Sequence, residues 1–248
     1  MRKMATVFRR RGPLPRICYV HLPKCGGISI TRALAKRYEG NVFKRRSSTF
    51  RLDEGSARRA EEFTGLPAID VRSTLLAYTL AQPANRLVAG HFLLTKSIIS
   101  ANAENWQFIT TLRNPIDRWL SHYNFNRERP GQKYYIDEPI EEFMESERGQ
   151  RLGTIMVEYF SGGALSAGDS IDEAFGKALE NLRQFTIVGS VEALPVFQSR
   201  LESLLGVSIK IGHSNRGPRK SFNDQDIRDK LKRICKPDLE LYDRFCRQ

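Results

Sequence analysis

Four short apolar runs, each of the kind that forms a buried strand, are separated along this sequence by segments long enough for helices. The runs span residues 17–22, 86–92, 106–112 and 185–189. Strands that alternate with helices predict βαβ units, and therefore a mostly parallel sheet with helices on both faces. We expect an α/β fold of three layers, in which ligands bind beyond the C-terminal ends of the strands.

The length of 248 residues is enough for one large domain. Residues 1–15 hold a cluster of arginines and two prolines, and we expect a flexible basic arm there. Residues 16–248 are expected to form a single domain, in which the glycine-containing stretch 126–170 is an insert or a lid. Apolar residues at helical spacing predict helices at 28–38, 55–64, 70–81, 116–123 and 194–205.

The C-terminal region is predicted to be extended at first and then helical. Residues 209–220 are broken by glycine and read as extended. Asn223 and Asp226 have the spacing of a capping box, which opens a helix. Pro237 interrupts that helix, because proline removes a backbone hydrogen bond and clashes with the preceding turn.

The first candidate site is the loop that follows the run at 17–22. It reads Lys24-Cys25-Gly26-Gly27-Ile28-Ser29 and leads into a predicted helix. Glycines let the backbone approach an anion, and the start of a helix presents unpaired N–H groups and a positive dipole end. Lys24 adds a mobile charge and Ser29 a hydroxyl, so the loop can hold a phosphate. It lacks the GxxxxGK[ST] pattern of a Walker A loop, and a structural turn would explain two glycines equally well.

The second candidate site follows the run at 106–112. Arg113 stands at the end of the predicted strand, where its guanidinium can bind a phosphate through two hydrogen bonds. Asn114 can cap the next helix and Pro115 fits its first turn. Ser121 lies two turns further on and can offer a hydroxyl to the same anion. A capped helix with solvent-facing charges is the alternative explanation.

Together these two motifs resemble those of sulfotransferases that use 3′-phosphoadenosine-5′-phosphosulfate (PAPS). The form His21-Leu-Pro-Lys-Cys-Gly-Gly27 is most similar to the branch of the heparan sulfate 2-O- and 6-O-sulfotransferases and their bacterial relatives. The resemblance continues at 86–92, 181–189 and 215–242, and covers about two thirds of the chain. It implies a P-loop-like α/β fold, PAPS as co-substrate, adenosine 3′,5′-bisphosphate as product, and no metal.

The resemblance also implies roles for single residues. The loop from Lys24 to Ser29, with Cys25, Gly26, Gly27 and Ile28, would hold the 5′-phosphosulfate. Arg113 and Ser121 would hold the 3′-phosphate. A later stretch would close over the nucleotide with Ser214, Asn215, Arg216 and Lys220. Cys25 and Ile28 replace threonines of the usual pattern, so two hydroxyl contacts to phosphate are lost.

Sulfuryl transfer needs a base for the acceptor hydroxyl and a positive charge near the leaving phosphate. Lys24 suits the second task, because an ammonium at the bridging oxygen gains most in the transition state. His91, at the end of the run 86–92, is our candidate base, since histidine removes protons near neutral pH. A structural, hydrogen-bonded histidine is the alternative, and His21, His122 and His213 are weaker candidates for the base.

Composition limits the classes of binding partner but does not identify the acceptor. A net charge of +12 favours anionic ligands, but no RRM, KH, zinc-finger or basic-zipper signature is present, so we expect no nucleic-acid partner. The four cysteines have no zinc-site spacing, and we expect no metal. No apolar run is long enough to span a membrane and no export signal is recognisable, so we expect a cytoplasmic protein. The expected cleft is flanked by basic residues that would suit an acidic glycan or an acidic peptide, although a solvated face explains them equally well. They are Lys44, Arg45, Arg46, Arg51, Arg127, Arg129 and Lys133.

Several alternatives remain at this point. The acceptor could be a tyrosine in a peptide or a small molecule rather than a carbohydrate. A nucleotide kinase with a degenerate phosphate loop is disfavoured, because GK[ST] and a magnesium-binding aspartate are missing. A non-catalytic protein that retains the nucleotide site is the third reading. The sequence does not specify the oligomeric state.

Overall fold

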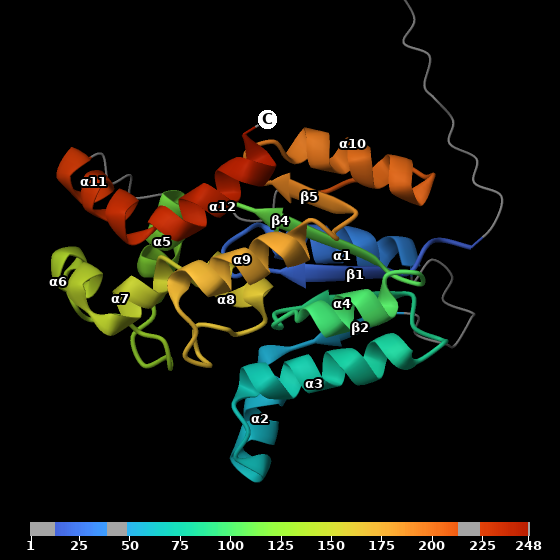
Figure 1. Ribbon diagram of the computed structural model, residues 1–248, viewed down its shortest axis with the longest axis horizontal. Coiled ribbons are helices and arrows are strands. Elements are labelled where there is room, and N and C mark those ends of the chain that lie inside the picture. Colours follow the sequence, from blue (N-terminus) through green and yellow to red (C-terminus); the bar gives the residue numbers. More distant parts are fainter. Residues whose placement is uncertain (1–12, 39–48, 213–223, 248) are drawn as a thin grey trace, which may run out of the picture.

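The computed structural model describes residues 13–38, 49–212 and 224–247. A five-stranded sheet forms the centre of the described chain, in the order β2-β3-β1-β4-β5 (Figure 1). All four strand pairings are parallel, which confirms the predicted α/β class. The strands are β1 (Ile17–His21), β2 (Thr49–Leu52), β3 (Leu87–Gly90), β4 (Gln107–Leu112) and β5 (Ile187–Ser190).

Helices cover both faces of the sheet and make the three predicted layers. One face carries Tyr19 and Ile109, and α1 and α10 pack on it through residues such as Ile30 and Phe197. The opposite face is covered by α3, α4, α8, α9 and α12 (Figure 1). The bounds of these helices are α1 (Gly27–Tyr38), α3 (Ala68–Ala81), α4 (Lys96–Asn102), α8 (Ile155–Ser161), α9 (Ile171–Leu182), α10 (Leu194–Leu205) and α12 (Lys236–Cys246).

A third apolar cluster lies beside the sheet, around Trp119, Tyr123 and Phe143. It joins α5 (Pro115–Arg127), α6 (Ile140–Glu145), α7 (Glu147–Leu152) and α11 (Gln225–Ile234). The stretch 126–170 is therefore divided between two places. Its first half builds this side cluster, whereas its second half supplies α8 to the main core.

Most predicted elements lie where the pattern placed them. The helix predicted at 194–205 is α10, and those at 55–64 and 70–81 are α2 (Glu54–Thr64) and α3. Asn114 caps α5 as expected, since its Oδ1 accepts from the N–H groups of Ile116 and Asp117 at 3.1 and 3.3 Å. Pro237 separates α11 from α12 and occupies the first turn of α12.

Several elements were not predicted individually, among them the short helices α6, α7 and α8 of the stretch 126–170, and one cap was misplaced. β2 escaped notice because it is an edge strand whose central residues, Phe50 and Arg51, face solvent. The helices α4 and α9 were also missed. The cap of α11 is Asp224 rather than Asn223, because the Asp224 carboxylate accepts from two N–H groups of the first turn.

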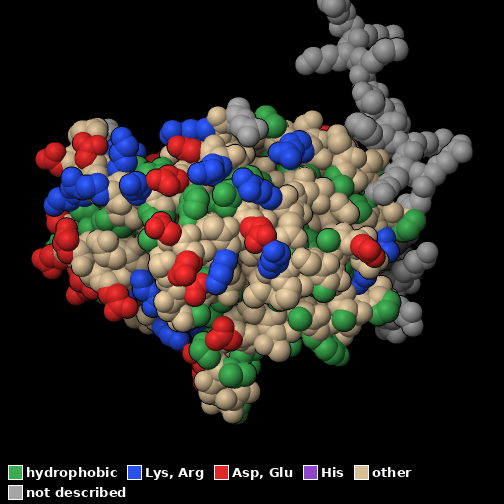
Figure 2. Space-filling model, in the orientation of Figure 1, with side chains coloured by type: hydrophobic (Ala, Val, Ile, Leu, Met, Phe, Trp, Pro, Cys, Tyr) green, Lys and Arg blue, Asp and Glu red, His purple; other side chains and the backbone are tan. Residues whose placement is uncertain are grey.

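Charge is mixed over the face of the molecule drawn in Figure 2, where basic and acidic side chains are interspersed. The basic surplus lies mainly in three stretches outside the described residues, 1–12, 39–48 and 213–223. Against one acidic residue, Glu39, these stretches contain Arg2, Lys3, Arg9, Arg10, Arg11, Lys44, Arg45, Arg46, Arg216, Arg219 and Lys220. Among the described helices, none has the length and apolar content needed to cross a bilayer.

Candidate active site

The C-terminal ends of the strands meet along one edge of the sheet, because every pairing is parallel. In register, Leu52 of β2 pairs with Gly90 of β3, and Gly90 pairs with Val20 of β1. Residues that follow these ends therefore lie near one another. Lys24 follows β1, His91 follows β3 and Arg113 follows β4, so the fold brings three predicted residues to one edge.

The turn between β1 and α1 requires its two glycines for different reasons. Gly26 has a φ of +72°, which residues other than glycine rarely adopt. Gly27 lies against the imidazole of His21, and a Cβ at this position would overlap that ring. Lys24 adopts a φ of +68° despite its side chain. The backbone of the turn is held from β4, where the Thr111 hydroxyl donates to the carbonyl of Cys25 at 3.0 Å.

The first turn of α1 carries no acidic side chain, so its positive dipole end is not neutralised from within the helix. Ser29 is half-buried there. Cys25 is fully buried, and its Sγ lies against the carbonyl of Pro23. Ile28, in contrast, is 43% exposed. The two positions that depart from the usual motif thus face opposite environments, the core and the solvent.

Lys24 has a cationic and partly apolar environment. Its Nζ lies 3.5 Å from the centroid of the Phe125 ring, and the guanidinium of Arg129 lies at the same distance from that ring. Burial, together with the charges of Arg113 and Arg129, lowers the pKa of Lys24 to about 8. An anion bound at the turn would relieve this repulsion, because it would favour the charged ammonium.

The tautomer of His91 follows from its hydrogen bond. Its Nδ1 contacts the backbone carbonyl of His21, and a carbonyl can only accept, so Nδ1 carries the proton. In the neutral ring Nε2 is therefore the basic nitrogen. Burial lowers the pKa of His91, the hydrogen bond to His21 opposes that shift, and the charge of Arg72 adds to it. The ring centroids of His91 and His21 are 4.3 Å apart.

Arg113 is buried, and its Nη1 donates to the carbonyl of Lys24 at 3.2 Å. The end of β4 is thereby tied to the turn after β1. Ser121 is half-buried on α5. His122 is a poorer base than His91, because burial and the charges of Arg118 and Lys24 lower its pKa to about 3.

Several charged residues near His91 were not singled out from the sequence. Arg72 of α3 is only 7% exposed, and its Nε and Nη1 have no hydrogen-bond partner among the described residues. Glu54, directly after β2, forms an ion pair of 2.6 Å with Arg58. Tyr134 lies 4.8 Å from the Arg58 guanidinium, so the segment after α5 reaches across to α2. The spacing of Glu54 and Arg58 could have been recognised as a helical ion pair, but nothing local marks Arg72.

Other predicted residues cannot be placed. Ser214, Asn215, Arg216 and Lys220 lie outside the described residues, as does His213. Within the described ranges, no group of three or more histidine, cysteine, aspartate or glutamate side chains could hold a metal ion.

Comparison with known proteins finds similarity only among solved structures. The sequence matches no family model and no curated protein. A sulfotransferase from Alicyclobacillus acidocaldarius aligns at 14% identity and a TM-score of 0.40, over 94% of this chain and 96% of that one. Mouse sulfotransferase SULT7A1, crystallised with PAP, aligns at 13% identity and a TM-score of 0.36. That alignment covers 90% of this chain but 63% of the mouse protein. Similarity this distant leaves the function to be argued from the residues of the chain.

Proposed function

We propose that this protein is a sulfotransferase that moves a sulfuryl group from PAPS to an acceptor hydroxyl. The observation that carries the proposal is the convergence of Lys24, His91 and Arg113 at the C-terminal edge of the sheet. Each follows a different strand, and hydrogen bonds from the side chains of Arg113 and His91 reach the backbone carbonyls of Lys24 and His21, respectively. A cation, a base and an anion-binding guanidinium are the three groups that the reaction needs.

The residues at this edge fit an anionic nucleotide. Gly26 and Gly27 leave the turn without side chains, and α1 begins there with no acidic residue in its first turn. We assign the 5′-phosphosulfate to this turn with Lys24 and Ser29, and the 3′-phosphate to Arg113 and Ser121. The burial of Cys25 removes its side chain from this role.

His91 and Lys24 would act on opposite ends of the reaction, the acceptor hydroxyl and the leaving phosphate. Bound PAPS supplies a sulfuryl group on a phosphate leaving group. His91 Nε2 accepts the proton of the acceptor hydroxyl, whose oxygen forms a bond to sulfur while the bond from sulfur to the phosphate oxygen breaks. The Lys24 ammonium stabilises the charge that grows on that oxygen, so it acts most strongly in the transition state.

We further propose an acidic carbohydrate as the acceptor. Arg72 is buried and its charge acts on His91; two of its guanidinium nitrogens have no partner among the described residues and would be satisfied by a carboxylate or sulfate. Arg129 adds positive charge near Lys24, since both side chains lie over the ring of Phe125. Membership of the heparan sulfate branch stays a prediction.

The test is transfer of label from ³⁵S-PAPS to a panel of sulfated and unsulfated glycans, tyrosine peptides and phenols. We expect labelled glycan with the wild type and at least a hundred-fold less with His91→Ala, because a general base contributes roughly 10²–10⁴ in rate. Arg37→Gln, at an exposed position on α1, is the control and should transfer normally. Labelling of peptide alone would overturn the acceptor, and labelling of nothing would overturn the function.

A further inference from the structure

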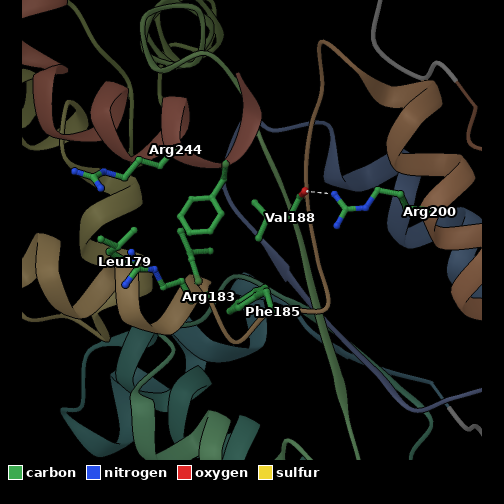
Figure 3. Close-up of a pocket in the computed structure, with 8 residues that line it drawn as sticks. Leu179, Arg183, Phe185, Val188, Arg200 and Arg244 are labelled. Carbon is green, nitrogen blue, oxygen red and sulfur yellow. Dashed lines mark hydrogen bonds between the residues drawn. The ribbon is translucent and has the colours of Figure 1, made fainter. Parts of the chain in front are cut away.

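A cavity of about 510 Å³ lies beside the edge strand β5 (Figure 3). It is bounded by α9, β5 and α12, with α10 contributing one residue. Its strand residue, Val188, pairs with Thr110 two positions before β4 ends. Arg183 and Phe185 lie in the connection that enters β5 from the opposite end. The cavity therefore shares no residue with the C-terminal edge, and its size is typical of small-molecule sites.

The floor of this cavity is apolar. Leu182, Phe185 and Val188 are buried beneath it, and Leu179 and Phe245 are partly buried around them. The parts of Leu179 and Phe245 that stay accessible are the apolar surface that a hydrocarbon body could remove from water.

The rim is cationic, and its charges are not neutralised. Arg183, Arg200 and Arg244 border the cavity, and none forms an ion pair with a described residue. Figure 3 shows Arg183 and Arg244 extending toward the same side, while Arg200 approaches from α10 and donates to the carbonyl of Val188 at 3.0 Å.

Acidic neighbours of the rim are occupied elsewhere. Glu180 of α9 pairs with Lys96, and Asp243 of α12 pairs with Arg247. The Arg244 guanidinium lies instead over the ring of Phe175, at 5.6 Å from its centroid. Within the described parts of the chain, no acidic side chain therefore neutralises Arg183, Arg200 or Arg244.

We propose that this cavity binds an amphipathic anion, a single carboxylate or sulfate head on an aliphatic body. Arg183 and Arg244 bind the head, since a guanidinium matches the planar geometry of such an anion. Leu179, Phe185 and Val188 contact the hydrocarbon. The site is independent of the donor site, so its occupancy requires no sulfuryl transfer.

Calorimetric titration of the full chain with decanoate tests the proposal. Decanoate should bind at one site, and decanol and decyltrimethylammonium should bind at least about ten-fold more weakly, because they lack the negative head. Lengthening the chain from octanoate to decanoate should tighten binding by up to about four-fold per methylene. Equal binding of decanoate and decanol would overturn the assignment of the arginines.

A matched pair of double variants makes the test specific. Arg183→Gln with Arg244→Gln should weaken decanoate at least about ten-fold, whereas Arg37→Gln with Arg233→Gln, at exposed positions elsewhere, should not. Both variants should bind adenosine 3′,5′-bisphosphate as the wild type does. Equal decanoate affinity in the two variants would contradict the proposal.

Sedimentation with vesicles separates a dissolved ligand from a lipid surface. Vesicles of phosphatidylcholine with phosphatidylglycerol should not capture the protein through this cavity. The opposite result would be that vesicles capture the wild type but not the Arg183→Gln, Arg244→Gln variant, and that decanoate does not bind. That result would show that the cavity binds a lipid surface and not a dissolved ligand.

Discussion

Two turns at the same edge of the sheet join a strand to a helix, and they are built in opposite ways. The turn from β1 to α1 consists of glycines and a strained lysine, and the first turn of its helix has no acidic side chain. The turn from β4 to α5 is closed by its own residues. Asn114 caps the helix, Pro115 occupies its first turn and Asp117 supplies a negative charge there.

The difference shows which helix end is available to a ligand. The first N–H groups of α5 already have an acceptor in Asn114, so this helix end has little left to offer an anion. Its turn can contribute only through the side chain of Arg113. The first turn of α1 has no acidic side chain, so a bound anion would supply the negative charge that this helix end lacks.

The largest effect is expected from Gly27→Ala, which places a methyl group against the ring of His21. That overlap can be relieved only if the His21 ring or the backbone of the anion-binding turn moves. We expect loss of adenosine 3′,5′-bisphosphate binding in calorimetry, and a stability loss of ~1–3 kcal/mol from overpacking.

Gly176→Ala on α9 is the control for that variant, because nothing lies within 4 Å of the added Cβ. It should bind the nucleotide normally and gain about 0.5–1 kcal/mol of stability, since alanine is the better helix former. A Gly27→Ala variant with wild-type affinity would show that the open turn is not the anion site.

His91→Ala should lower the transfer rate by roughly 10²–10⁴ while nucleotide affinity stays within about two-fold. The reason is that Nε2 acts on the acceptor proton and not on the donor. Single-turnover rates and nucleotide titrations on the folded variant measure the two effects separately. A rate close to that of the wild type would make His91 a structural residue. His21, His122 or an acidic residue in the segment 50–62 would then become the candidate base.

The pH dependence of kcat/KM should show two limits. Activity needs neutral His91, so it is present above the pKa of His91 and falls as pH drops through that pKa, which lies below 6.5. Activity also needs charged Lys24, so it falls as pH rises through about 8. The upper limit of kcat should lie at higher pH, because a bound anion favours the ammonium. An upper limit that Lys24→Ala leaves in place would contradict the assignment.

The smallest effect is expected at the closed turn. Asn114→Ala removes the cap of α5 and should cost about 1 kcal/mol in the free energy of unfolding, measured in urea. Nucleotide affinity should not change, because this helix end takes no part in anion binding. A loss of affinity as large as that of Arg113→Ala would erase the contrast between the two turns.

The two turns also show how far sequence can predict this molecule. In both, an apolar run is followed directly by residues typical of a turn or a helix start. The fold class and the positions of Lys24 and Arg113 at strand ends could therefore be predicted from local patterns. The helix α9 could have been found as well, because Ser170 and Glu173 form a capping box at its start.

Other features depend on contacts between distant segments. β2 is held by pairing with β3 and has little apolar pattern of its own. The proximity of Arg72 to His91 arises from the packing of α3 against the sheet and cannot be recognised from spacing. The burial of His91 and its hydrogen bond to the His21 carbonyl also depend on contacts between distant segments, and they set the properties of His91 as a base.

Recognition of the 3′-phosphate tests the central claim most directly. Adenosine 3′,5′-bisphosphate and AMP differ only in that phosphate, and both can be titrated calorimetrically into the wild type and Arg113→Ala. We predict that the wild type prefers the bisphosphate by at least ten-fold, and that Arg113→Ala loses most of this preference because a charge-assisted contact is removed. At saturation, the bisphosphate should also raise the melting temperature of the wild type more than AMP does. Equal affinity of the wild type for the two nucleotides would contradict a PAPS-dependent enzyme.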